Sequence, residues 1–221
     1  MEPPRTSIPH SAQNGQGPSS HTQTLNFLRW LYGDDAPGWL TIWTLPDKTT
    51  AWFPIERLDE ASRYATDRAP THDVYFGVGL RQRKLDRGRG TAGDVLAIPG
   101  LWIDIDLKHP AHCKLTLPET IEDVLDLLRK AIPLPATVLV DSGYGVHAYW
   151  LFRELWRLDD DAERARAAHL LRRFQSTILA EGQRQGWRLD STFNLAQLLR
   201  LPGCYNHKVP GEAREVHIHD L

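Results

Sequence analysis

The second half of the chain shows a regular pattern of hydrophobic and polar positions, which predicts alternating strands and helices. Within 116–132 the apolar residues recur at helical spacing, and Thr116 with Glu119 forms a capping box. A longer segment at 159–186 begins with aspartates and carries an apolar stripe up to Gly186, which predicts a second helix. Strands are predicted at 101–107, 136–142, 145–152 and 215–219.

The order strand, helix, strand, strand, helix, strand is that of a ferredoxin-like or RNA-recognition-type (RRM-like) lobe. Gly143-Tyr144-Gly145 supplies the tight turn of the central hairpin. In such a lobe both helices pack on one face of the sheet, and the other face is free for chemistry. We therefore predict an α+β fold in which residues 100–221 form this lobe.

The first part of the chain predicts a smaller N-terminal α/β lobe at residues 21–99. A short amphipathic helix is predicted at 21–33, and another helix at 56–66. The segment 81–94 is basic, contains glycine and lacks periodicity, so we expect a mobile loop. Strands are predicted at 39–45, 49–55 and 73–81.

The composition of the 221 residues, 41% of which are hydrophobic, is that of a globular protein with a core. Residues 1–20 are rich in Pro, Ser, Gly and Gln, which predicts a disordered leader ahead of a folded domain at 21–221. The formal net charge of -2 indicates no global basic field, although it leaves room for a local basic groove. With only Cys113 and Cys204, no bilayer-spanning apolar run and no signal-peptide pattern, we expect a cytoplasmic protein without a disulfide framework or a membrane partner.

Two carboxylates interrupt the apolar strand at 101–107. Because successive side chains of a strand alternate between faces, Trp102, Asp104 and Asp106 share one face. Like charges repel at that spacing and lose solvation on a mostly buried sheet, so a divalent cation or basic groups would compensate them. The alternative is an edge strand whose acids face water, because two acids at this spacing are common.

A single histidine, His147, projects from the apolar strand at 145–152. It is either a core histidine bonded to a carbonyl group or part of a site. The predicted fold allows its strand to lie beside the strand of Asp104 and Asp106, which favours a site.

The segment 187–208 adds a third acid and two cations. Asp190 either caps a short helix predicted at 191–199 or joins the other acids. Arg200 and Lys208 lie on either side of a Pro-Gly turn. Three acids, a histidine and two cations together form a set suited to handling phosphate.

These residues resemble the archaeo-eukaryotic primase (AEP) superfamily, and more closely its primase-polymerase (PrimPol) branch with RepB-like primase domains of bacteria, plasmids and phages. The resemblance covers about residues 73–220 and rests on WIDID, SGYGVHAYW and RLD, in this order, followed by LLRLPGCYNHK, which is similar to an R-x-PG-x-x-N-x-K tail. It implies an N-terminal lobe packed on the RRM-like lobe. One departure is Gly145, where many relatives have serine, so that a phosphate-contacting hydroxyl would come from Ser142 or be replaced by a backbone amide.

The resemblance implies a DNA primase or polymerase that adds nucleotides with two Mg²⁺ or Mn²⁺ ions. The implied partners are single-stranded DNA template, a primer strand and NTP or dNTP, together with a helicase or accessory region of a longer replication protein of bacterial, phage or plasmid origin. The sequence leaves the choice between ribo- and deoxynucleotides open. The implied metal ligands are Asp104, Asp106 and Asp190, and the implied nucleotide-binding residues are Ser142, Gly145, His147, Arg200 and Lys208.

The template strand is expected along the basic, aromatic-containing surface of the N-terminal lobe. The alternative for each of these side chains is an ordinary solvated charge. The candidate phosphate contacts are Arg81, Arg83, Lys84, Arg87 and Arg89.

Two other functions fit parts of the pattern. VHIHDL, with His217 and His219, matches the metal-binding strand of rolling-circle (HUH-type) replication endonucleases, which also need a catalytic tyrosine downstream. A non-catalytic module that binds single-stranded nucleic acid is the other alternative, although the lobe lacks an aromatic pair on its first and third strands.

A zinc site is also conceivable, but its ligand spacing matches no established pattern. Ordinary surface or core side chains are the simpler interpretation. The residues concerned are His109, His112, Cys113, Cys204 and His207.

Overall fold

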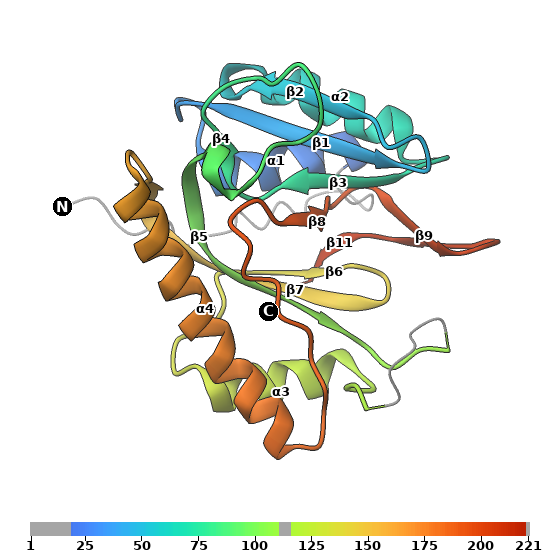
Figure 1. Cartoon of the computed structure of the whole chain (residues 1–221). Coiled ribbons are helices and arrows are strands. Elements are labelled where there is room, and N and C mark those ends of the chain that lie inside the picture. The colour runs from blue at the N-terminus through green and yellow to red at the C-terminus, as the bar shows by residue number, and fades with distance from the viewer. Residues whose placement is uncertain (1–18, 111–115, 220–221) are drawn as a thin grey trace, which may run out of the picture.

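The computed structural model describes residues 19–110 and 116–219, and it shows an α+β fold built on one large sheet (Figure 1). The main path of strands through this sheet is β11-β6-β7-β5-β4-β1-β3-β8, and β2 pairs with β1. Most of the predicted leader lies outside the described residues. Its last residues differ from the prediction, because Ser19 caps the first helix and Ser20 begins it.

The N-terminal part consists of two helices packed on one face of four strands (Figure 1). Phe27 and Leu28 of the first helix, Ala65 of the second, and Ile42 and Phe76 of the strands are fully buried in one shared core. Both predicted helices and the strands predicted at 39–45 and 49–55 are confirmed here, with small shifts at their ends. Their bounds are α1 Ser20–Tyr32, β1 Trp39–Leu45, β2 Thr50–Pro54, η1 Ile55–Arg57, α2 Leu58–Arg68 and β3 Asp73–Gly77.

The strand predicted at 73–81 is divided into β3 and a short β4 (Leu80–Arg81). The Tyr32 hydroxyl donates to the Val78 carbonyl oxygen at 2.8 Å and also lies 3.2 Å from that of Gly77, where the strand breaks. Strand β4 then pairs with both β1 and β5 and so joins the two halves of the sheet.

The second half confirms the predicted order of strands and helices. Helices α3 (Ile121–Ala131) and α4 (Asp161–Arg184) cover one face, where Ile103 and Ile105 are buried. Figure 1 shows α3 below β7, whereas α4 runs down the left side of the strands to α3. The strands of this half are β5 Val95–Asp106, β6 Val138–Asp141, β7 Gly145–Arg157 and β11 His217–His219.

Strands β5 and β7 are longer than predicted and extend into the N-terminal half. The strand was predicted to begin at residue 101, but β5 begins at Val95 and passes Pro99-Gly100 with an irregularity in its pairing with β7. A side chain at Gly100 would collide with the Trp150 carbonyl oxygen, so glycine permits the close approach of the two backbones. Strand β5 therefore runs across residue 100, where the lobe boundary was predicted.

Two local predictions are wrong, and one small sheet was missed. The capping box of α3 is formed by Thr120 and Asp123 rather than Thr116 and Glu119. The helix predicted at 191–199 is absent, because Leu198–Arg200 forms strand β8 and pairs with β3, an interaction of distant segments that local pattern does not reveal. A two-stranded sheet of β9 (Tyr205–Val209) and β10 (Glu212–Glu215) was not predicted.

Within the described ranges, no helix is long and apolar enough to cross a membrane.

Candidate active site

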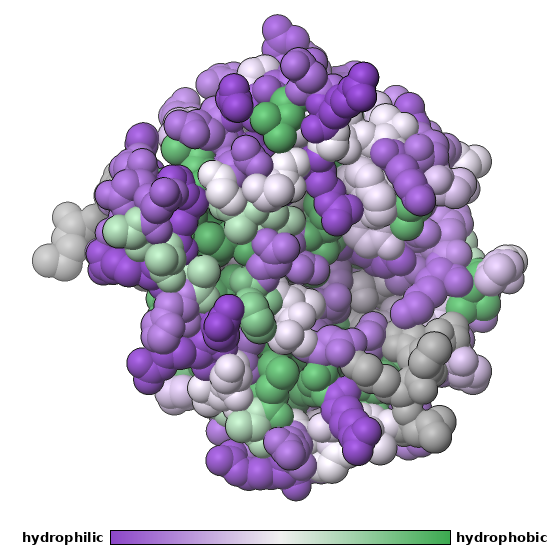
Figure 2. Space-filling view, viewed as in Figure 1, coloured by the Kyte–Doolittle hydropathy of each residue, from purple (hydrophilic) through white to green (hydrophobic). Residues whose placement is uncertain are grey.

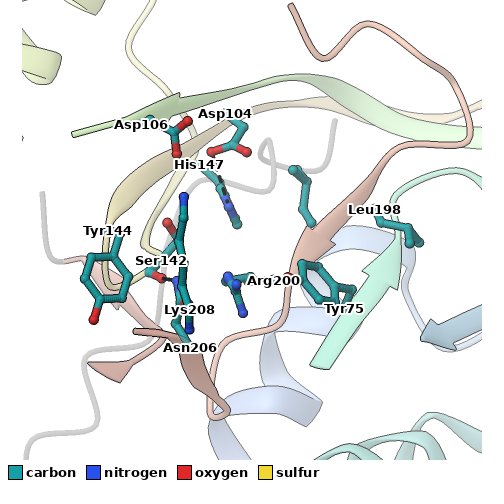
Figure 3. A pocket seen from close by; sticks show the side chains of 11 residues that line it. Tyr75, Asp104, Asp106, Ser142, Tyr144, His147, Leu198, Arg200, Asn206 and Lys208 are labelled. Atoms are coloured by element: carbon teal, nitrogen blue, oxygen red, sulfur yellow. Dashed lines mark hydrogen bonds and ion pairs between the residues drawn. The ribbon is translucent and has the colours of Figure 1, made fainter. Parts of the chain in front are cut away.

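A pocket of about 180 Å³ opens where β5 and β7 face the N-terminal strands (Figure 3). This volume is smaller than that of typical small-molecule sites, so the pocket would enclose only part of a larger ligand. One wall is acidic and the opposite wall carries cations. The lining residues are Tyr75, Asp104, Asp106, Ser142, Tyr144, His147, Leu198, Leu199, Arg200, Asn206 and Lys208.

The two acids of β5 share one face, as predicted, and the strand register brings His147 to them. Asp104 pairs directly with His147, and Asp106 pairs with Gly145. The His147 Nε2 atom lies 3.5 Å from Asp104 Oδ1. The predicted convergence of Asp104, Asp106 and His147 is therefore confirmed in geometry.

The electrostatic state of this acidic wall follows from burial. Desolvation, reinforced by the charge of Asp106, raises the pKa of Asp104 from 3.8 to about 7. Desolvation, together with the Arg200 charge, lowers the pKa of His147 from 6.5 to about 3. His147 is consequently neutral at physiological pH, and its buried Nδ1 atom has no hydrogen-bond partner among the described residues. Asp104, by contrast, becomes fully ionised near pH 7 only if a cation besides Arg200 and Lys208 compensates its charge.

The opposite wall is formed by Arg200 of β8 and Lys208 of β9. The Arg200 side chain is only 11% exposed, forms an ion pair with Asp73 and lies over the Tyr75 ring with 4.7 Å between the guanidinium carbon and the ring centroid. These contacts hold a cation at a defined place opposite the acids, as Figure 3 shows. Lys208 is exposed and reaches the same pocket.

A buried hydrogen-bond network supports Asp104 from behind. The Asp104 backbone N–H donates to the Thr192 hydroxyl at 3.3 Å. Gln175 of α4 accepts from the Thr192 N–H at 2.8 Å, and its amide donates to the Trp102 carbonyl oxygen at 2.7 Å. This network takes the place of a neighbouring strand along this edge of β5, whose pairing with β4 ends at Ala97.

Asp190 is exposed and lies two residues before Thr192, in the segment between α4 and β8. It is not among the residues that line the pocket, but its negative charge contributes to the raised pKa of Asp104. Since the predicted helix at 191–199 is absent, Asp190 is not its cap. Across residues 19–110 and 116–219, no group of three or more His, Cys, Asp or Glu side chains is arranged to hold a metal ion, so the role of Asp190 as a third metal ligand stays a prediction.

The turn before β7 places Ser142 in the pocket wall. The Asn206 amide donates to the Ser142 carbonyl oxygen at 2.6 Å and ties this turn to β9. Gly145 does not line the pocket, and a side chain there would meet the Ile105 carbonyl oxygen at 2.6 Å. Close packing of β7 on β5 thus gives a structural reason for glycine where the resemblance expects serine.

The tail from Arg200 to Lys208 is largely buried between the two halves. The Thr24 hydroxyl donates to the Pro202 carbonyl oxygen at 2.7 Å, and Gly203 has a positive φ of 85° next to α1. Cys204 is buried against α2, with its pKa raised to about 12 by burial, and His207 Nε2 contacts the Ala69 carbonyl oxygen at 2.8 Å.

These contacts oppose the zinc alternative. Cys204 and His207 contact backbone carbonyl groups of the N-terminal half, and His109 packs on the Tyr144 ring. His112 and Cys113 lie outside the described residues.

The two histidines of β11 point away from the pocket. Ile218 pairs with Val140, which in turn pairs with His147, so these three residues share the face of the site. His217 and His219 alternate with Ile218 and therefore project from the opposite face. This geometry disfavours the rolling-circle nuclease, which would need both histidines at the acids.

One predicted DNA contact is wrong. Arg81 is fully buried, and its guanidinium donates to the carbonyl oxygens of Gly79, Arg89 and Ala196 because no water reaches it there. Arg83 and Lys84 are exposed, so their contact with DNA stays a prediction.

Sequence reasoning missed several residues of the site. Tyr75 and Tyr144 line the pocket, and Thr192 and Gln175 support Asp104. Tyr144 was read only as a turn residue. The one available signal was the adjacency of Thr192 to the RLD motif.

Neither the protein family models nor the curated proteins include a match to this sequence. Solved structures do match. The AEP domain of the cyanophage S-2L primase-polymerase superposes with a TM-score of 0.58 at 15% identity, over 90% of this chain and 88% of that one. The chain therefore has the fold of the AEP primase-polymerases, as the sequence motifs indicated.

Primase RepB' matches with a TM-score of 0.47 at 14% identity, over 89% of this chain and 56% of that one. The catalytic domain of primase RepB' in complex with initiator DNA matches with a TM-score of 0.46 at 15% identity, over 90% and 85% of the two chains.

Proposed function

We propose that this domain is a template-directed nucleotidyltransferase. It would act as a DNA primase or DNA polymerase that adds nucleotides to a primer, or starts primers, on a single-stranded DNA template. The observation that carries the proposal is the division of the pocket into an acidic wall, with Asp104 and Asp106, and a cationic wall, with Arg200 and Lys208. A triphosphate with divalent cations is a ligand whose charges match both walls.

The acidic wall fits divalent metal in its donor chemistry. Asp104 and Asp106 offer carboxylate oxygens, which Mg²⁺ and Mn²⁺ prefer. Desolvation and the charge of Asp106 raise the pKa of Asp104 although Arg200 and Lys208 oppose the shift, so a further cation beside it would be favourable. Asp190 is the candidate for a third ligand, because its charge already influences Asp104. When bound, two such ions would activate the 3′-hydroxyl of the primer and neutralise the triphosphate.

The protein's own groups would position the triphosphate between the two walls. Arg200, fixed by Asp73 and Tyr75, supplies a positive charge at a defined place, and Lys208 supplies a second one. His147 is neutral and adjoins Asp104, so it would donate a hydrogen bond rather than a charge. Ser142 and the backbone at Gly145 are the candidates for further phosphate contacts.

The decisive experiment incubates the domain with a primed template, each nucleotide set, and magnesium or manganese. We expect extension and pyrophosphate release that depend on template and metal, and the loss of both in Asp104→Asn and Asp106→Asn. A suitable control is Asp126→Asn, an exposed acid of α3 whose ion pair with Arg129 lies outside the pocket. Full activity in either active-site variant would refute the role of the acids.

The same assay separates the alternatives. A non-catalytic binding module would retain single-stranded DNA without releasing pyrophosphate. A rolling-circle nuclease would form a covalent protein-DNA product, visible on a denaturing gel.

A further inference from the structure

A row of side chains leads out of the candidate active site across the N-terminal strands. The register pairs Arg200 of β8 with Tyr75 of β3, and Tyr75 with Trp43 of β1. Directly paired residues project from the same face of a sheet, so these three side chains form one line.

The rings and guanidinium groups of this row are in contact. The guanidinium carbon of Arg200 is 4.7 Å from the Tyr75 ring centroid, and the Tyr75 and Trp43 centroids are 5.5 Å apart. At the far end, the Arg89 guanidinium lies over Trp43 at 5.0 Å. We call these four residues, Arg200, Tyr75, Trp43 and Arg89, the stacking row. It consists of two aromatic rings with a cation at each end.

The core of the N-terminal half does not use this face. The opposite face of the same strands, with Ile42 and Phe76, is fully buried against α1 and α2. Tyr75 and Trp43 remain partly exposed, and Arg89 is exposed.

The two ends of the stacking row have different surroundings. Tyr75 and Arg200 line the pocket (Figure 3), whereas Arg89 belongs to the loop between β4 and β5 near β1 (Figure 1). In the space-filling view, the upper part of the molecule, where Figure 1 places this loop, is mostly hydrophilic with some hydrophobic residues between (Figure 2). Residues 82–90 carry four exposed cations and a single acid, Asp86. The exposed cations are Arg83, Lys84, Arg87 and Arg89.

We propose that the stacking row binds the bases of a single-stranded template and leads them to the pocket, an inference that rests on the proposed function. Partly exposed aromatic rings beside a basic strip match unpaired bases on a phosphate backbone, whereas a duplex hides its base faces. An exposed cation–π contact is weaker than the stacking of a base on an indole. A base therefore replaces the Arg89 guanidinium on Trp43, and the released guanidinium pairs with a neighbouring phosphate.

The test compares two labelled oligonucleotides of equal length and charge, an oligothymidylate of about 20 nucleotides and its abasic analogue. Fluorescence anisotropy gives the affinity of each for the wild-type chain and for Trp43→Leu, which retains an apolar strand residue but lacks a stacking surface. We expect the wild type to prefer the oligothymidylate, and Trp43→Leu to bind it roughly 5- to 100-fold more weakly with little change for the abasic strand.

A matched pair of variants tests the arginine. Arg166 lies over Trp156 at 6.0 Å, a similar pair outside the stacking row. Arg89→Ala is expected to weaken binding of both strands, because a phosphate contact is lost, whereas Arg166→Ala is expected to change neither.

Equal affinity of the wild type for the two strands would overturn the inference without any variant, as would an equal loss for both strands in Trp43→Leu. Affinity of the wild type for Mg²⁺–triphosphate is measured separately. A domain that prefers bases in the predicted way but releases no pyrophosphate would refute the proposed function alone. If Trp43→Leu extends primers as well as the wild type, only the stacking row would be refuted.

Discussion

Replacing Asp104 by asparagine should stabilise the metal-free protein at neutral and alkaline pH, although it should abolish nucleotide transfer. Asn has nearly the same shape as Asp, so it opens no cavity. It removes a carboxylate whose ionised form is disfavoured by desolvation and by the charge of Asp106.

The magnitude follows from the pKa. The folded state raises the pKa of Asp104 from 3.8 to about 7, so between these values the folded state binds more protons than the unfolded one. Stability from this group is thus present below about pH 4 and lost as the pH rises through 7. Each pKa unit corresponds to about 1.4 kcal/mol, which sets an upper limit of roughly 4 kcal/mol. The Asp104 side chain is 30% exposed, and solvent screening reduces the expected effect to about 1 to 3 kcal/mol.

The assay is urea unfolding of wild type and Asp104→Asn in a metal chelator, at intervals from pH 4 to pH 8.5. The difference between the two unfolding free energies isolates Asp104, because other groups titrate in both proteins. His147 is one of these, and it acts with the opposite sign. Its pKa is lowered to about 3, so its contribution is present above about pH 6.5 and lost as the pH falls toward 3.

Magnesium provides the second half of the test. Ions that bind the folded wild type should stabilise it at pH 7.5 by mass action and leave Asp104→Asn almost unchanged. A difference between the two proteins that does not vary with pH would refute the raised pKa. Equal stabilisation of both by magnesium would refute the placement of the ion at Asp104.

Further measurements test the rest of the site. Thr192→Val removes the acceptor for the Asp104 N–H and should reduce metal affinity and primer extension by about 10- to 100-fold. Thr192→Ser should retain both properties. Isothermal titration with Mn²⁺ measures the metal affinity. Gly145→Ala should lower the unfolding free energy by roughly 1 to 3 kcal/mol in denaturant titrations, because its new methyl group would meet the β5 backbone at 2.6 Å, and wild-type stability would contradict the packing. Arg200→Ala should weaken triphosphate binding far more than binding of single-stranded DNA, and equal losses would favour a structural role instead. The double variant His217→Ala, His219→Ala should release pyrophosphate at a near-normal rate, since both side chains project from the far face, and a covalent DNA product lost in this variant would overturn the assignment.

The local pattern was sufficient for most helices and strands of the RRM-like lobe. The helical spacing of α3 and α4 and the alternation of β5 and β7 reflect which face each residue buries, and burial is recorded directly in residue type. The shared face of Asp104 and Asp106 follows from the same alternation. The resemblance to the AEP superfamily rested on these residues in order, and the chain has the fold that this resemblance implied.

The pattern failed where a distant segment decides the conformation. Residues 191–199 have apolar spacing compatible with a helix, yet β3 recruits Leu198–Arg200 as a strand, and Gln175 and Trp102 bind the backbone of Thr192. Arg81 looked like one more cation of a basic loop, but the surrounding carbonyl groups hold it in the interior. In each case the deciding hydrogen-bond partner lies far away along the chain.

By itself, the sequence determined the composition of the site: two acids on one strand face, one histidine on another strand, and two cations flanking a Pro-Gly turn. Only the tertiary structure decided that Asp104 lies opposite His147, that Tyr75 and Trp43 continue the line of Arg200, and that His217 and His219 face away. The physical reason is that alternation along a strand assigns each side chain to a face, whereas the register between strands, which arises from packing of the whole sheet, assigns it a neighbour.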